Sequence, residues 1–219
     1  MTGSSAPGRR HHACREIHGR LRTFSRGGAA VAPGLQSPPV ISEVEGCGYT
    51  VRMMISATLA KAFNEQIAHE FGASMQYVSI AAHFQKHHLT LLAKLFFAQA
   101  EEEREHAMKF VKYVLDTKAD LRIPEIPAAT PVFPSAEAAV QAALTWEQDV
   151  TRQITALMEQ AVKDNDYLAQ SFLQWFIDEQ LEEVVKMDRL LSVIRQSGEK
   201  NLLMVEAYLV HIEKVGGGD

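Results

Sequence analysis

The chain has 219 residues and a formal net charge of −5, with 47% apolar and 22% charged residues. This composition excludes a wholly disordered chain, a collagen-like chain and a strongly basic nucleic-acid-binding protein. No run of about eighteen apolar residues occurs, so the sequence predicts no membrane-spanning helix. Residues 1–54 carry a net charge of +4 and residues 55–219 a net charge of −9. The chain therefore divides into a basic front segment and an acidic remainder.

Residues 1–54 are predicted to be a disordered N-terminal extension. They contain eight of the 13 glycines, four of the eight prolines and both cysteines, without a periodic apolar pattern. Their seven arginines suggest a targeting segment. A misplaced start is the other explanation, because Met53 and Met54 directly precede the first helix signal. A group of possible metal ligands in this segment matches no closed site: His11, His12, Cys14 and His18.

Residues 55–215 are predicted to form one all-α domain. Only two glycines interrupt this region, and its four prolines all fall within 124–134. The expected helices span about 56–86, 90–117, 135–163, 166–197 and 200–214, and the expected N-caps of the first four are Ser56, Thr90, Ser135 and Asp166. Four helices of about 28–31 residues, each about 42–47 Å long, suit a four-helix bundle. The prolines mark one long crossover, and a short fifth helix follows the bundle.

Each apolar stripe of the four long helices is interrupted near its midpoint by a polar side chain that can bind a metal. These side chains are Glu70, Glu103, His106, Glu147 and Gln180. Helices of equal length bring their midpoints to one level, so the five side chains are expected to meet in the core. Each unpaired buried carboxylate costs several kcal/mol, and three would consume most of the ~5–15 kcal/mol that holds a domain together.

No lysine or arginine lies on the stripes at this level, so a pair of divalent cations is the predicted partner of the carboxylates. Oxygen ligands with one imidazole suit iron or manganese better than structural zinc. Glu103 and His106 are spaced i and i+3, which places both on one helix face. Taken singly, each Glu reads as solvated and His106 as a satisfied core residue; the metal interpretation depends on all five together.

Two further features leave alternatives open. Tyr77 lies two turns from Glu70 and is either a core aromatic or a hydrogen-bonding or redox-active neighbour of the site. A second acidic group is either a solvated face or an additional part of the site: Glu102, Glu179, Glu182 and Glu183. Its sequence neighbours are too apolar for a wholly exposed face. Because the predicted domain contains no cysteine, a reducing, cytoplasmic compartment is expected.

Over about residues 56–214 the sequence resembles the ferritins, and among them the haem-free bacterial type. The resemblance rests on these motifs: Asn64-Glu65-Gln66 with Glu70 and Tyr77, Glu102-Glu103-Arg104-Glu105-His106, Glu147, and Phe172-Leu173-Gln174-Trp175 leading to Glu179-Gln180. It implies that Glu70, Glu103 and His106 hold a first iron. It also implies that Glu103 bridges to a second iron, completed by Glu147 with Gln180 and Tyr77 adjacent. The second acidic group is similar to the third iron site of bacterial ferritins.

The sequence also departs from related families. Bacterioferritins and rubrerythrin-like proteins carry a second Glu-x-x-His on the fourth helix, where this chain has Gln180-x-x-Glu183. Bacterioferritins have a haem-ligating Met where this chain has Arg104, so no haem is expected. The positions that line the acidic three-fold channel of animal ferritins are Gln170 and Leu173 here. The usual iron entry route therefore does not carry over.

The resemblance implies an iron-storage protein with ferroxidase activity. Such a protein oxidises Fe(II) with O₂ or H₂O₂ at a di-iron centre and stores Fe(III) as mineral inside a shell of 24 identical chains. No nucleic-acid or membrane partner is expected. The second iron would lack a histidine ligand and be held less tightly, which suits iron as a substrate. The alternatives are a di-metal oxidase or peroxidase that retains its irons, and a non-catalytic cage subunit.

Overall fold

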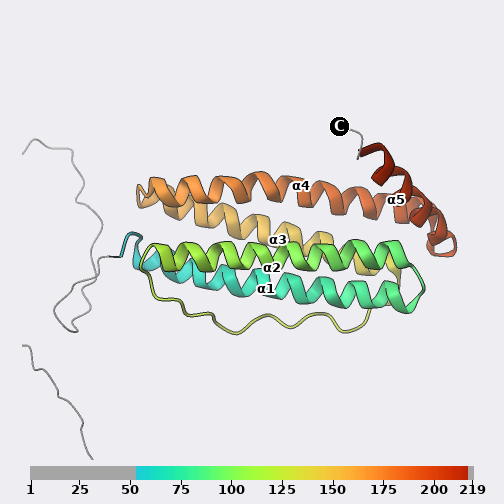
Figure 1. Ribbon diagram of the computed structural model, residues 1–219, viewed down its shortest axis with the longest axis horizontal. Helices are drawn as coiled ribbons and strands as arrows, with labels where there is room; N and C mark the ends of the chain where they lie inside the picture. The colour runs from blue at the N-terminus through green and yellow to red at the C-terminus, as the bar shows by residue number, and fades with distance from the viewer. Residues whose placement is uncertain (1–52, 217–219) are drawn as a thin grey trace, which may run out of the picture. The chain divides into compact units, whose positions relative to one another are not determined.

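The computed structural model describes residues 53–216, with side chains described through residue 211. It confirms the predicted all-α fold, a four-helix bundle with one long crossover and a short fifth helix (Figure 1). The helices are α1 (Ala57–Lys86), α2 (Thr90–Asp116), α3 (Ala136–Lys163), α4 (Tyr167–Ser197), the short 3-10 helix η1 (Glu199–Asn201) and α5 (Leu202–Gly216). None of the helices in the described range combines the length and the hydropathy that a membrane span requires. The predictions for residues 1–52, including the His11, His12, Cys14 and His18 group, lie outside the described residues.

The last two residues of the predicted N-terminal extension, Met53 and Met54, lie within the described range. Met53 packs against the core at one end of the bundle. The backbone N–H of Met54 donates to the carbonyl oxygen of Thr117 at 2.9 Å, just after α2 ends. A tertiary hydrogen bond and an apolar contact therefore attach the end of the predicted extension to the bundle.

Three of the four predicted N-caps are confirmed. The side-chain oxygen of each cap accepts a hydrogen bond from the backbone N–H three residues on, which satisfies an otherwise unpaired helix donor. The bonds are Leu59 N to Ser56 Oγ at 3.1 Å, Ala138 N to Ser135 Oγ at 3.0 Å and Ala169 N to Asp166 Oδ1 at 2.9 Å. At the other end of α4, Gly198 has φ +70°, a backbone conformation that L side chains rarely adopt.

The predicted N-cap of the second helix is wrong. Thr90 is the first residue of α2, and Leu89 before it makes no side-chain cap. Instead, Glu206 of α5 accepts hydrogen bonds from the backbone N–H groups of Leu91 at 2.8 Å and Leu92 at 2.9 Å. A carboxylate at this position also interacts favourably with the positive end of the helix dipole. The fifth helix thus supplies the cap that the local sequence lacks.

The segment after α4 also contributes to the start of α3. The carboxylate of Glu199 in η1 accepts from the backbone N–H of Glu137 at 2.9 Å and of Ala136 at 3.2 Å. Two bundle helices therefore begin against acidic side chains from the C-terminal segment. This arrangement gives η1 and α5 a stabilising role within a single chain.

Replacing Glu206 with Ala is expected to destabilise the protein by about 1–2 kcal/mol, because two N–H groups at the start of α2 lose their acceptor. Glu206→Gln retains an acceptor without the charge and should lose less. Guanidinium unfolding measures the stability, and amide hydrogen exchange should show faster exchange in the first turn of α2. Equal exchange rates in the wild type and Glu206→Ala would contradict a capping role.

The apolar core consists of two clusters separated along the bundle axis. One cluster contains Tyr77, Phe84, Phe96 and Leu191, and the other contains Phe63, Phe110, Ile154 and Phe176. The boundary between them falls near the middle of each long helix. Polar side chains occupy this boundary on all four helices, as the sequence stripes predict, and the candidate site lies there.

Candidate metal centre

Three of the predicted side chains form one compact group at the middle of the bundle. Glu70 of α1 and Glu103 and His106 of α2 each offer a ligand atom, and these atoms all lie within 4.8 Å of one another. Their exposed fractions are 1%, 1% and 4%. His106 Nδ1 lies 3.4 Å from Glu103 Oε2. We call Glu70, Glu103 and His106 the central trio.

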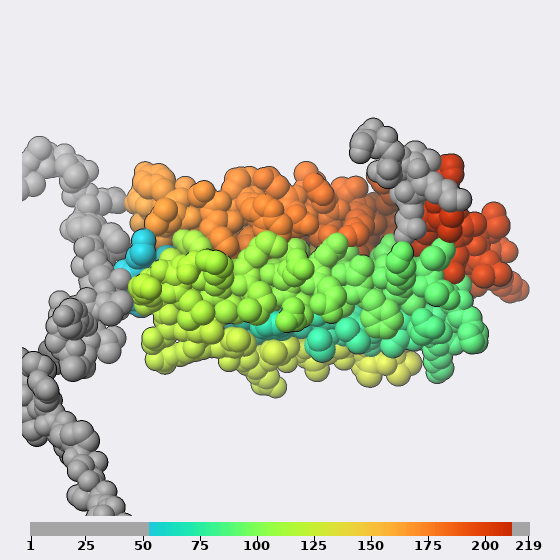
Figure 2. Space-filling model, viewed as in Figure 1, coloured from blue at the N-terminus to red at the C-terminus, as the bar shows by residue number. Residues whose placement is uncertain are grey.

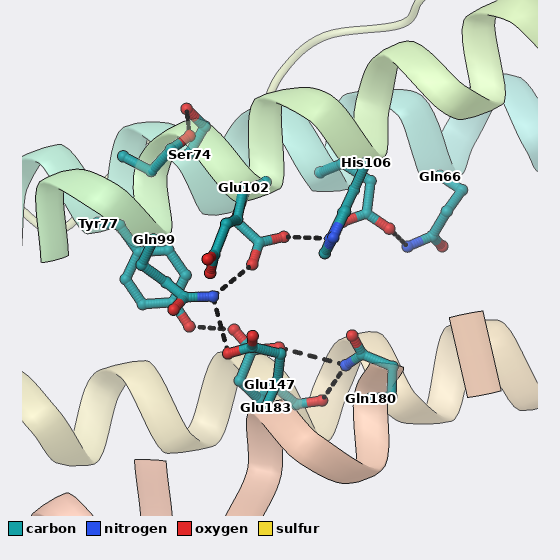
Figure 3. Close-up of polar contacts among 12 residues, drawn as sticks. Gln66, Ser74, Tyr77, Gln99, Glu102, His106, Glu147, Gln180 and Glu183 are labelled. Atoms are coloured by element: carbon teal, nitrogen blue, oxygen red, sulfur yellow. Dashed lines mark hydrogen bonds and ion pairs between the residues drawn. The ribbon is translucent and has the colours of Figure 1, made fainter. Parts of the chain in front are cut away.

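Aromatic side chains and an amide orient the trio. The rings of Trp175 and Phe176 meet the His106 imidazole edge-on, with centroid distances of 5.4 and 5.8 Å. The Gln66 amide donates from Nε2 to Glu70 Oε1 at 2.8 Å (Figure 3). The other oxygen, Glu70 Oε2, is buried and has no hydrogen-bond partner among the described residues. An unpartnered buried carboxylate oxygen beside two other ligand groups fits a metal ligand.

Glu147 of α3 faces the trio but is held by its own neighbours. The Tyr77 hydroxyl donates a short hydrogen bond to Glu147 Oε1. Gln180 Nε2 of α4 lies 3.2 Å from Glu147 Oε2 and 3.2 Å from its backbone oxygen (Figure 3). The structure therefore brings Glu147, Tyr77 and Gln180 together. Tyr77 is both fully buried among apolar side chains and hydrogen-bonded to the candidate site.

Burial controls the protonation of these carboxyl groups. It raises the pKa of Glu70 to about 8, with the negative charge of Glu103 adding to the effect. Burial raises the pKa of Glu147 to about 7, partly opposed by the Tyr77 hydrogen bond. The pKa of Glu103 is raised well above its usual range by burial and by the charges of Glu147 and Glu183. Without a cation, the site therefore retains protons near neutral pH.

The donor set fits a divalent cation of the iron type. Within residues 53–211, no lysine or arginine forms an ion pair with Glu70, Glu103 or Glu147. Three buried carboxyls without such a partner favour either protonation or metal binding. Carboxylate oxygens with one imidazole and no thiolate match the preferences of Fe or Mn.

The second acidic group is only partly assembled. Glu183 is buried, with 3% of its surface exposed, whereas Glu179 is half-buried and Glu102 and Glu182 are exposed. On α4, Glu183 is buried and the adjacent Val184 is half-buried and packs against the core.

Lys186 pairs with two members of that group. Its Nζ lies 3.2 Å from Glu183 Oε1 and 3.1 Å from Glu102 Oε2. Burial alone would lower the pKa of Lys186, but the two carboxylates outweigh it and raise this pKa. The ion pair with Glu102 joins α2 to α4.

Sequence reasoning assigned no role to three residues that contact the candidate site: Gln66, Gln99 and Lys186. Gln99 Nε2 lies 2.7 Å from Glu183 Oε2 and 3.3 Å from Glu103 Oε1, so it links the trio to the second acidic group (Figure 3). A local signal exists for all three. Gln66 and Gln99 each precede a candidate ligand by four residues, and Lys186 follows Glu183 by three, spacings that place side chains together on a helix.

Comparison with known proteins identifies the class to which this fold and site belong. A model described as "Ferritin-like domain" matches residues 60–197, more than half of the chain. "Ferritin BfrB" of Mycolicibacterium smegmatis is 40% identical over 155 residues, covering 71% of this chain and 85% of that protein. "Bacterial non-heme ferritin" of Staphylococcus haemolyticus is 36% identical over 146 residues, covering 67% of this chain and 88% of that protein.

A solved structure agrees with these sequence matches. The fold resembles an open-pore ferritin from the archaeon Archaeoglobus fulgidus with a TM-score of 0.69 and 28% identity, covering 72% of this chain and 97% of that one. The chain therefore belongs to the ferritin family, a family of iron-storage proteins.

Proposed function

We propose that this protein is a ferritin that oxidises Fe(II) within its helical bundle and stores the Fe(III) product. The observation that carries the proposal is the buried central trio beside Glu147, which combines three carboxyl groups and one imidazole without a lysine or arginine partner in the described residues. Glu70, Glu103 and His106 would bind one Fe(II). Glu103 and Glu147 would bind the second, with Gln180 and Tyr77 adjacent.

The proposed reaction takes one electron from each of two Fe(II) ions. The two electrons, together with two protons, convert either one O₂ to H₂O₂ or one H₂O₂ to two water molecules. Binding of the cations displaces protons that burial retains on the carboxyls, because metal ligands must be deprotonated. Gln66 holds one oxygen of Glu70 in place, and the packing of Trp175 and Phe176 orients His106.

The two halves of the site differ, which favours iron as a substrate over iron as a retained cofactor. The trio has its ligand atoms together and an unpartnered oxygen on Glu70. On the other side, both carboxylate oxygens of Glu147 are engaged by Tyr77 and Gln180. A second ion must compete with these hydrogen bonds, so it would bind less tightly and leave more readily.

Storage requires a closed assembly, and we propose a shell of 24 copies of this chain that encloses the mineral. The relatives' ferritin names support an assembled storage protein. Residues 1–54 would be an extension to the ferritin-like domain of residues 55–215, with a cytoplasmic location. No haem is proposed.

Aerobic loading with Fe(II), followed by chromatography and particle sizing, tests assembly, oxidation and storage together. The expected result is a large assembly that takes up many more iron atoms than its oxidation sites can hold. If uptake stops at about two irons per chain and these irons stay bound through turnover, the protein is instead a di-metal oxidase or peroxidase that retains its irons. If the assembly forms but Fe(II) oxidises no faster than in buffer, the chain is a non-catalytic cage subunit.

A further inference from the structure

Lys186 holds a position between two carboxylates from different helices. Its ammonium lies 3.2 Å from Glu183 on its own helix α4 and 3.1 Å from Glu102 on α2. Helices α2 and α4 lie side by side on the face of the bundle seen in Figure 2. The side chains of Lys186 and Glu102 are 39% and 49% exposed, whereas that of Glu183 is only 3% exposed. The ammonium thus meets one carboxylate at the surface and one in the core.

Lys186 also stands at the outer end of a continuous row of polar contacts. From the central trio, Glu103 Oε1 contacts Gln99 Nε2 at 3.3 Å, and the same amide nitrogen contacts Glu183 Oε2 at 2.7 Å. Gln99, Glu102 and Lys186 line one cavity of about 240 Å³. The side-chain oxygen Gln99 Oε1 is buried without a hydrogen-bond partner among the described residues. Besides the two carboxylates, this region thus contains an amide oxygen that makes no hydrogen bond and is free to bind a cation.

A structural salt bridge is the simpler interpretation of these contacts. Exposed ion pairs contribute only about 0–1 kcal/mol, which suits the contact between Lys186 and Glu102. An energy this small does not describe the contact with Glu183, because a nearly buried carboxylate without a positive partner costs several kcal/mol. Among the lysines and arginines in the described part of the chain, Lys186 is the one that pairs with Glu183. Removing its charge leaves a carboxylate pair that requires another cation.

A metal ion at this place would use the oxygens that the ammonium contacts. Lysine amines ordinarily carry their positive charge at neutral pH. Two cations a few ångströms apart repel each other strongly, so the ammonium and a divalent ion exclude each other here. The resemblance to bacterial ferritins implies a third iron in this group, but the structure shows a lysine between two of its four carboxylates.

We propose that the Lys186 ammonium is the resident cation of the Glu102–Glu183 pair and excludes a third metal ion from it. Each chain then binds two metal ions within its bundle, at the trio and at Glu147, and a third ion binds only when Lys186 loses its charge. The proposal rests on the proposed function for the first two ions.

The test compares Zn²⁺ binding to the wild type and to Lys186→Met, which keeps the length of the side chain and removes its charge. Chelator-treated, assembled protein is equilibrated with Zn²⁺ by dialysis, and bound zinc is measured per chain. We expect Lys186→Met to bind one more zinc than the wild type and Lys186→Arg to bind the wild-type number. Arg189→Met is the matched control, because it removes a positive charge one turn further along α4 and should add no zinc.

Crystals soaked in Zn²⁺ locate the additional ion by anomalous scattering. A peak between Glu102 and Glu183 in Lys186→Met only, absent from Lys186→Met/Glu183→Gln, is the expected result. A peak there in the wild type, or equal zinc numbers in the wild type and Lys186→Met, overturns the proposal. Failure of the proposed function gives a different result, since Glu103→Gln would then remove no zinc from the wild type.

Discussion

Replacing Glu103 with Gln is expected to slow Fe(II) oxidation at least about 100-fold while the assembly still forms. Glu103 is the carboxylate common to both proposed iron positions. The Gln side chain that replaces it has the same shape but binds cations weakly. Changes in residues that merely support a metal site cost about 10–100-fold, so loss of a shared ligand should cost at least as much. The initial rate of Fe(III) formation under air measures the effect, and His106→Ala should give a comparable loss.

The neighbouring Glu105 supplies the matched control for this experiment. It lies two residues from Glu103 on the same helix but is exposed. Glu105→Gln changes the net charge equally and should leave the oxidation rate within about twofold of the wild type. An unchanged rate in both Glu103→Gln and His106→Ala would falsify the assignment of the trio as the oxidation site.

The metal-free protein is expected to lose stability as the pH rises from about 5 to about 8.5. Burial raises the pKa of Glu70 from 4.5 to about 8 in the folded state. Below pH 4.5 the carboxyl is protonated whether the chain is folded or unfolded, so it contributes no pH dependence. Above that value the unfolded chain ionises freely, whereas the folded chain must either retain the proton or bury a charge. The full loss through pH 8 is on the order of 5 kcal/mol for Glu70 alone.

The Glu70→Gln variant isolates this contribution. A Gln at this position can still accept the Gln66 hydrogen bond but cannot ionise. Guanidinium unfolding of chelator-treated protein at fixed concentration should show similar stabilities near pH 5 and a more stable variant near pH 8.5. Added Zn²⁺ should stabilise the wild type more than the variant, because binding to the folded state alone raises stability.

Glu65→Gln is the control for this experiment, since Glu65 is an exposed residue of the same helix paired with Lys61. Parallel loss of stability with pH in the wild type and Glu70→Gln would show that ionising Glu70 costs nothing in the folded protein. That result would contradict the physical basis for a cation in the core.

Much of the site could be expected from the sequence because helix periodicity assigns a side chain to the core without knowledge of its partners. Glu70, Glu103, His106, Glu147 and Gln180 each interrupt an apolar stripe near its midpoint, and all five are buried in the structure. Glu183 and Val184 are adjacent, and the rotation of the helix decides which of them faces inward.

The sequence by itself determined the helices, three of their four caps, the long crossover and the level of the polar layer. These features depend on local spacing, breaker residues and short side-chain-to-backbone bonds. Only the tertiary structure decided which polar groups pair across helices, including Tyr77 with Glu147, Lys186 with Glu102, and Glu206 with the start of α2. Such pairs depend on the rotation and axial offset of whole helices, which residues far apart in the sequence set together through packing.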